Sequence, residues 1–271
     1  MRHCTLGFRG FAARFGTLAV LLALLLIPLP VAAWGKAGHR AVATLATTLL
    51  SAEAQAQVAT LLDPGTTLAD ISTWVDEVRP SRPNTGPWHY VNIPGETSGY
   101  NAQRDCSRGC VVSAIEESLR LLQDPTKDRA VRQEALKWVV HLVADLHQPL
   151  PAVADDRGGN DVIVRFNGRQ TNLHRLWDGD MIDRAYPSQT VLPERVQAAM
   201  QTANWRAWQG GRPQDWAEET HRVAIEAVYL FPASRGIDER YDEKALPVIH
   251  EQLAKGAVRL AGVLNRAFAG N

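Results

Sequence analysis

The chain has few cysteines, no excess of charge of either sign and little continuous apolar sequence. Of its 271 residues, 3 are cysteines, and 29 basic residues balance 29 acidic ones. This balance argues against a protein that holds nucleic acid mainly through a basic surface. No internal repeat, low-complexity tract or long linker divides the sequence. We therefore expect one domain with one buried core.

One long apolar run, Leu18–Ile27, lies near the N-terminus. Two prolines end it before the roughly 20 residues that a membrane-spanning helix needs. Arginines precede the run and Val31-Ala32-Ala33 follows it, which is typical of a cleaved signal peptide; an uncleaved anchor is the weaker alternative. We expect residues 1–33 to be a signal peptide, residues 34–271 to be the mature domain, and the protein to be secreted or periplasmic.

The mature chain is mildly acidic and keeps two cysteines. The signal region holds three arginines and no acidic residue, which leaves 26 basic against 29 acidic residues. Attraction for phosphate would then have to come from bound cations. Cys106 and Cys110, an even pair in an exported protein, predict a disulfide. A two-cysteine zinc site is the competing interpretation, but no further cysteine remains to complete it.

Periodicity and capping signals predict an all-α fold, a compact multi-helix single domain of about eight helices with one short β-hairpin. The expected helical segments are 38–50, 51–62, 67–79, 111–123, 128–148, 173–184, 194–208, 215–229 and 242–268. The hairpin is expected at Val162–Phe166, because Asn167-Gly168 follows and suits a tight turn.

Two His-x-x-x-Asp pairs, His141/Asp145 and His174/Asp178, lie on expected helices. Residues four apart leave the same helix face one turn apart. Imidazole nitrogen and carboxylate oxygen are ligands that zinc favours. A single pair of this kind also occurs as an ordinary hydrogen bond on a helix surface, so one pair alone is weak evidence.

Further residues of metal-ligand type precede these pairs. His39 lies five residues after Trp34, and Asp76 and His89 follow. Cleavage after Ala33 would free an α-amino group at Trp34, and that amine is a nitrogen ligand that no internal residue can supply. Together with the two pairs, this set predicts a hydrolytic site with several zinc ions.

Six motifs occur in order along the mature chain. They are Trp34-Gly35-Lys36-Ala37-Gly38-His39, Trp74-Val75-Asp76-Glu77-Val78-Arg79, Trp88-His89-Tyr90-Val91-Asn92, His141-Leu142-Val143-Ala144-Asp145-Leu146-His147-Gln148-Pro149-Leu150, Gly158-Gly159-Asn160-Asp161 and Thr171-Asn172-Leu173-His174-Arg175-Leu176-Trp177-Asp178. In this order and spacing, the chain resembles the S-one/P-one family of zinc-dependent single-strand-specific nucleases over essentially its whole mature length.

The resemblance implies a helical fold of the phospholipase C/P-one nuclease type. It also implies a secreted endonuclease and 3′-nucleotidase that cleaves single-stranded DNA and RNA to 5′-phosphate products. A compact domain of this kind could act as a monomer, with no membrane attachment once the signal is removed.

Three zinc sites follow from the resemblance. The first zinc would be held by Asp76, His89, His141 and Asp145. The second would be held by the amine and carbonyl of Trp34, by His39 and by a bridging Asp145. The third would be held by His174, Asp178 and a histidine directly after the Gln-Pro-Leu run.

That histidine is absent, because Pro151 occupies its position. Proline has no side-chain donor, so the third site would keep two of its three protein ligands. His147 is not expected to replace the ligand, since it lies upstream on the helix that carries the first pair. Asp155 or Asp156 are candidate replacements. We expect two firmly bound zinc ions and a weakened third site.

Other residues match family positions that contact substrate. Arg79 corresponds to an arginine that contacts the phosphate, with a helix-end salt bridge as its alternative role. Tyr90 corresponds to an aromatic residue that stacks a base, with packing beside Trp88 as its alternative. Asn92 would hydrogen-bond that base, and Asn160 is a further substrate-binding candidate. With Asp76 and Asp145, Arg79 completes the expected catalytic set.

Two other functions stay open at the level of the sequence. A zinc-dependent phospholipase C shares the mature N-terminal tryptophan and attacks a phosphodiester in a lipid. A zinc-binding relative disabled at Pro151 would have no activity. His221 and His250 lie in late helices without carboxylates at ligand spacing and are expected to be surface or core residues.

Overall fold

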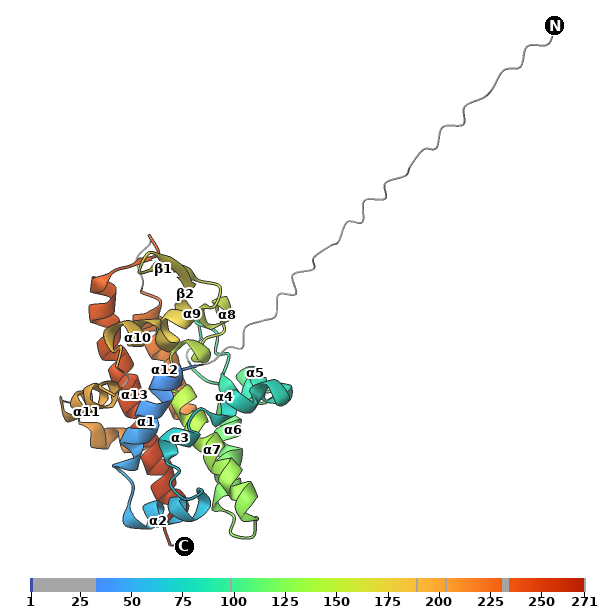
Figure 1. Cartoon of the computed structure of the whole chain (residues 1–271), viewed down its shortest axis with the longest axis vertical. Coiled ribbons are helices and arrows are strands. Elements are labelled where there is room, and N and C mark those ends of the chain that lie inside the picture. Colours follow the sequence, from blue (N-terminus) through green and yellow to red (C-terminus); the bar gives the residue numbers. More distant parts are fainter. Residues whose placement is uncertain (2–32, 98, 189, 203, 231–233, 271) are drawn as a thin grey trace. The chain divides into compact units, whose positions relative to one another are not determined.

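The computed structural model describes the whole chain except residues 2–32, 98, 189, 203, 231–233 and 271. The expected signal peptide therefore lies almost entirely outside the described residues. The remaining residues belong to one unit, residues 31–271. Helices dominate it (Figure 1), which confirms the expected all-α fold.

The α-helices are α1 Lys36–Thr47, α2 Ala52–Leu61, α3 Leu68–Ile71, α4 Trp74–Val78, α5 Ala102–Asp105, α6 Val111–Gln123, α7 Arg129–Asp145, α8 Asp156–Gly159, α9 Leu173–Arg175, α10 Met181–Ala185, α11 Leu192–Thr202, α12 Pro213–Val223 and α13 Glu239–Phe268. Short 3-10 or π segments are η1 Arg79–Ser81, η2 Pro83–His89, η3 Leu150–Ala152, η4 Leu176–Asp180, η5 Trp205–Gln209 and η6 Ala224–Val228. Helix α6 has the bounds that the sequence predicts.

The expected helix at 67–79 is instead broken into α3, α4 and η1. Thr67 and Asp70 form a capping box that starts α3. At the break, the Ser72 hydroxyl donates to the Ala69 carbonyl, and the Ser72 carbonyl accepts from the ring of His141. The break therefore supplies a backbone acceptor to a candidate metal ligand.

Other predicted boundaries also shift. Helix α7 ends at Asp145 rather than at residue 148, in agreement with the bias against helix before Pro149. The segment expected as one helix at 173–184 consists of α9, the π segment η4 and α10. Single π turns inside helices occur frequently at functional sites, and η4 carries Asp178.

The predicted hairpin is confirmed. Strands β1 (Ile163–Phe166) and β2 (Arg169–Asn172) pair antiparallel. Asn167 and Gly168 between them both have positive φ, at 51° and 72°, as a tight turn of this type requires. A third strand, β3 (Gly236–Ile237), pairs parallel with β1. The sequence gives no sign of this third strand, because two residues carry no periodic signal.

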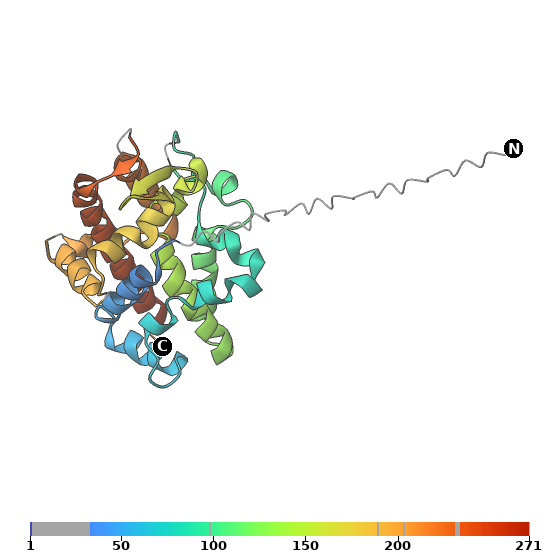
Figure 2. The ribbon, with the colours of Figure 1, turned by 45° about the horizontal axis from the view of Figure 1, so that its top comes forward.

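The core forms around the long helix α13, which packs against α1, α7 and α11. Helix α1 also contacts α7, and Figures 1 and 2 show α1 between α13 and α7. Fully buried members of this core include Trp34, Leu136 and Phe268. Among the described residues, no helix has the length and apolar character needed to cross a membrane.

Core packing predicts a clear difference between two leucine truncations. Leu136 on α7 is fully buried, whereas Leu230 is 72% exposed. Leu136→Ala should lower the free energy of unfolding by about 2–5 kcal/mol, since it leaves a cavity. Leu230→Ala should change it by less than about 0.5 kcal/mol. Urea unfolding in one zinc-containing buffer measures both, and equal losses would contradict this arrangement of the core.

Candidate metal centre

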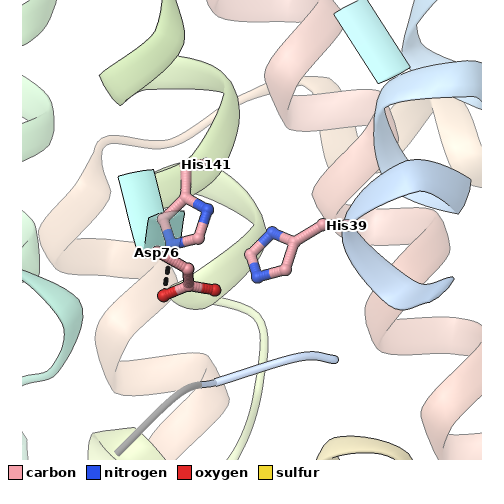
Figure 3. A group of neighbouring side chains, drawn as sticks. All are labelled: His39, Asp76 and His141. Atoms are coloured by element: carbon pink, nitrogen blue, oxygen red, sulfur yellow. Dashed lines mark ion pairs between the residues drawn. The ribbon is translucent and has the colours of Figure 1, made fainter. Parts of the chain in front are cut away.

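Three side chains from separate helices form the first ligand cluster. His39, Asp76 and His141 place their ligand atoms within 4.8 Å of one another. Figure 3 shows them pointing toward a common point, with His39 on α1, Asp76 on α4 and His141 on α7. The rings of His39 and His141 stack at 4.2 Å, and His141 Nε2 lies 3.7 Å from Asp76 Oδ1.

Asp145 joins this cluster to His89. His89, His141 and Asp145 form a second group of ligand atoms within 4.8 Å. Asp145 Oδ2 lies 2.9 Å from His89 Nδ1 and 3.2 Å from His141 Nε2. Its other oxygen, Oδ1, lies 3.3 Å from His39 Nε2. The two carboxylate oxygens thus face different imidazoles, which is the geometry that a bridging ligand requires.

Burial makes this carboxylate depend on positive charge. Asp145 and His141 are both fully buried. Burial opposes ionisation of Asp145, but the adjacent His141 and the hydrogen bonds from the histidines hold its pKa well below the usual value. Burial likewise opposes a charge on His141, yet Asp145 and Asp76 raise its pKa to about 9. Burial and the neighbouring His141 lower the pKa of His39. The site therefore attracts a cation.

Several polar atoms of the cluster lack hydrogen-bond partners. Among the described residues, His39 Nδ1 and Nε2, His89 Nε2 and Asp145 Oδ1 are buried without a hydrogen bond. Buried polar atoms are nearly always bonded. Nitrogen and carboxylate oxygen are ligands that zinc favours. The residues present therefore fit divalent metal ions of the zinc type.

A backbone contact orients one of these ligands. The ring Nδ1 of His141 lies 2.8 Å from the Ser72 carbonyl. A carbonyl only accepts, so Nδ1 carries a proton, and Nε2, which faces Asp76 and Asp145, is the nitrogen that a metal ion would bind in place of a proton. Such partners behind a metal-binding histidine fix its tautomer and ring orientation.

The other pair, His174 and Asp178, is held by a different set of contacts. His174 Nδ1 donates to the Gly158 carbonyl at 2.6 Å, and His174 Nε2 lies 3.5 Å from Asp178 Oδ1. The Gln148 amide donates to the same oxygen at 2.6 Å. Burial raises the pKa of Asp178 well above its usual value, and the charges of Asp145 and Asp76 add to the rise.

Pro151, at the position where the resemblance requires the third ligand of this pair, is buried. It lines the same small cavity as His89, Asp145 and Gln148. His147 is directed elsewhere, since its Nδ1 donates to the Val143 carbonyl and its Nε2 accepts from Arg259 at 2.9 Å. Three protein ligands for a third ion are therefore not assembled from these residues.

The candidate replacements for that ligand also lie apart. The Asp155 carboxylate accepts from the Gly95 amide at 2.6 Å, and Asp155 and Asp156 are both exposed. Asp155 thus already has a backbone partner.

Trp34 is fully buried at the start of α1. The Gly35 amide donates to the Asp178 carbonyl at 2.8 Å, which ties the segment before α1 to η4. Gly38 allows the tryptophan to pack, because a Cβ at residue 38 would lie 2.8 Å from Trp34 Cβ. The α-amino ligand itself stays a prediction.

Two of the expected substrate residues, Tyr90 and Asn92, lie on the segment that follows η2. The Tyr90 carbonyl accepts from the Val111 amide, and the next residue, Val91, donates to the Pro151 carbonyl. Tyr90 is half-buried and Asn92 is exposed. The segment therefore runs directly past Pro151.

The other predicted residues are Asn160, Arg79 and the two cysteines. The Asn160 amide donates to the Arg157 carbonyl at 2.9 Å. Arg79 starts η1 immediately after α4, the helix that carries Asp76. The expected disulfide between Cys106 and Cys110 is present.

Sequence reasoning missed the residues that orient the ligands. Ser72 and Gln148 carry no spacing signal, because a carbonyl or amide contact depends on where another element packs. The Gly158-Gly159 pair offered a signal, since both residues adopt positive φ, at 63° and 79°.

Comparison with known proteins agrees with this geometry. A family model described as S1/P1 Nuclease matches residues 34–269. Nuclease S1 of Aspergillus oryzae is 29% identical, covering 86% of this chain and 91% of that protein. Endonuclease 2 of Arabidopsis thaliana is 32% identical, covering 87% and 90%. Nuclease P1 of Penicillium citrinum is 28% identical, covering 86% and 97%.

Two glycines provide a matched test of how His174 is placed. Gly158 and Gly168 both have positive φ, but a Cβ at 158 would lie 2.7 Å from the Leu150 carbonyl oxygen, whereas a Cβ at 168 meets nothing within 4 Å. Gly168→Ala should cost about 1–2 kcal/mol of stability from backbone strain. Gly158→Ala should cost at least about 1 kcal/mol more, because the Leu150 backbone must shift.

Urea unfolding measures these costs, and metal analysis gives a second measure. At zinc concentrations high enough to load the weak third site, Gly158→Ala should also lower the zinc content, since the Gly158 carbonyl holds His174. Gly168→Ala should leave the zinc content unchanged. Identical behaviour of the two variants would contradict a role for Gly158 in holding this ligand.

Proposed function

The chain belongs to the S1/P1 nuclease family, and we propose that it is a zinc-dependent endonuclease and 3′-nucleotidase acting on single-stranded DNA and RNA. The products would be 5′-phosphates. The observation that carries the proposal is the buried Asp145 carboxylate, whose two oxygens face imidazoles from three separate segments of the chain.

The ligand sets can be assigned from this geometry and the family motifs. One zinc would be held by Asp76, His89, His141 and Asp145. A second would be held by the Trp34 amine and carbonyl, by His39 and by Asp145. When bound, zinc lowers the pKa of a coordinated water and neutralises charge on a phosphodiester.

The protein's own groups would bind and orient the substrate. The fixed fork of the Arg79 guanidinium suits tetrahedral phosphate oxygens. Tyr90 would stack an unpaired base, and Asn92 would hydrogen-bond it, which favours single strands because a stacked base must leave its pair. Asn160 lies in the turn after Gly158, beside the element that holds His174, and would contact the same strand.

Export to the periplasm or the cell exterior is part of the proposal. The Cys106–Cys110 disulfide supports it, because disulfides persist in oxidising compartments. Secretion would follow cleavage after Ala33, which also creates the Trp34 amine. The protein would act as a monomer without membrane attachment.

The alternative of a phospholipase C is not carried forward, because the matching family model and the relatives named above are nucleases by name. The alternative of a disabled relative applies only to the third site. With Pro151 in place of a donor, we propose two firmly bound zinc ions and reduced activity rather than none.

Removal of metal tests the proposal as a whole. Treatment with a chelator should abolish hydrolysis of single-stranded DNA, and added zinc should restore it. Asp145→Asn should lower kcat by at least about 100-fold and reduce bound zinc, because it removes the charge shared by both ions. Asp63→Asn, which alters an exposed carboxylate, should do neither. Undiminished turnover in metal-free protein would refute the proposal.

Substitution of Pro151 tests the third site. Pro151→His should raise the zinc content from about two to about three ions and increase kcat, because it restores an imidazole ligand. Pro151→Ala is the control, since it removes the proline ring without adding a donor. Metal analysis and steady-state rates on a 3′-nucleotide measure both effects. A wild-type protein with three ions would show that another group already completes the site.

A further inference from the structure

A second cavity lies between α10, α11, η5 and α13, and none of its wall residues belongs to the metal-ligand clusters. Its volume is 640 Å³, within the range of about 300–1,000 Å³ typical of small-ligand sites. Figure 1 shows α11 beside α13, and residues of both helices line the cavity. The proposed nuclease chemistry uses none of these residues.

One unpaired cation faces this cavity. Arg195 lies near the start of α11 and is exposed. Within the part of the chain that the structure describes, its guanidinium makes no ion pair. The cavity also contains Glu251, but that carboxylate is paired with Lys255 Nζ at 2.6 Å. Lys255 in turn pairs with Glu219. Glu251 thus has a cationic partner of its own, whereas the guanidinium of Arg195 is left to meet a ligand, and its planar fork suits phosphate oxygens.

Aromatic side chains form other parts of the wall. Trp208 on η5 is half-buried and has Lys255 Nζ 5.5 Å from its ring centre. Tyr186, which ends α10, forms a 2.8 Å hydrogen bond with His250 Nε2 on α13. This bond holds the two walls together. The pKa of His250 is lowered, mainly by burial and also by the positive charge of Arg195. This agrees with His250 lying near the Arg195 guanidinium.

A cavity with one free guanidinium and aromatic faces suits a ligand that joins a phosphate to a flat ring. We propose that the cavity bounded by Tyr186, Arg195, Trp208 and His250 is a second nucleotide-binding site, separate from the metal centre. Arg195 binds the phosphate, Trp208 stacks the base, and the Tyr186–His250 pair borders the sugar. The choice of a nucleotide over other aromatic anions rests on the proposed function.

Two sources share this chemistry. One is a free mononucleotide, such as a product of hydrolysis. The other is a nucleotide unit of a single strand whose scissile phosphate lies at the metal centre. If the cavity binds a unit of the substrate strand, it would raise the affinity for long substrates without changing the reaction. Once the strand is bound at the metal centre, its binding to the cavity is intramolecular.

Photolabelling of the mature, zinc-loaded protein with 8-azidoadenosine 5′-phosphate tests the site. Mass spectrometry should find label in peptides that contain residues 186–208 and 247–251. Arg195→Gln should reduce this label about 10-fold, because a charge-assisted contact is lost. Arg206→Gln is the matched control, since Arg206 is also exposed but lies over Trp205, outside the cavity wall. Equal labelling of the two variants, or label confined to residues 88–92, would overturn the inference.

Competition separates the two sources. A single-stranded oligonucleotide that suppresses cavity labelling at lower nucleotide concentration than 5′-AMP would assign the site to the strand. The opposite order would assign it to the free nucleotide. Failure of both competitors would refute specific nucleotide binding. Arg195→Gln should leave the hydrolysis of a dinucleotide unchanged, because that substrate is too short to use a separate site.

The labelling result tests the second site separately from the proposed nuclease activity. Specific cavity labelling in a protein that hydrolyses no single-stranded nucleic acid would refute the proposed function and leave the nucleotide site standing. An active nuclease with an unlabelled cavity would refute only the second site.

Discussion

The burial of one carboxylate, Asp145, is the constraint on which the rest of the site depends. An ionised carboxylate without solvent is costly unless positive charge surrounds it. Three imidazoles, from α1, the end of η2 and α7, converge on its two oxygens. Helices α1, α4 and α7 each carry a candidate ligand. The metal site is therefore assembled only when these helices pack together. Metal binding would therefore stabilise the fold.

The surrounding contacts explain how the ligands keep their orientation. The break between α3 and α4 frees the Ser72 carbonyl for His141, and the tight Gly158 turn presents a carbonyl to His174. The Gly35 amide fastens the start of the domain to η4, next to Asp178. Each of these irregular points thus serves a residue of the site. In a continuous regular helix, these backbone groups would form hydrogen bonds within the helix instead.

The charge of the mature chain bears on how it would hold an anionic strand. If residues 1–33 are removed, as we propose, it would have 26 basic and 29 acidic residues and no basic surplus to attract phosphate over long range. Affinity for the strand would have to come from positive charge at particular sites. Metal bound at the Asp145 cluster would supply one such place, and Arg195 at the second cavity would supply another. A nuclease built in this way would depend less on ionic strength than one with a broad basic face.

The sequence by itself determined the fold class, the bounds of α6, the hairpin turn at Asn167-Gly168, the disulfide and the grouping of His and Asp residues. These features depend on local periodicity, turn chemistry and ligand spacing, which are present in the chain before it folds. Tertiary structure alone decided that His147 faces Arg259, that Gln148 bonds Asp178, that strand β3 joins β1, and that Tyr186, Arg195 and Trp208 border one cavity. Those contacts join residues from separate elements, and no spacing along the chain encodes them.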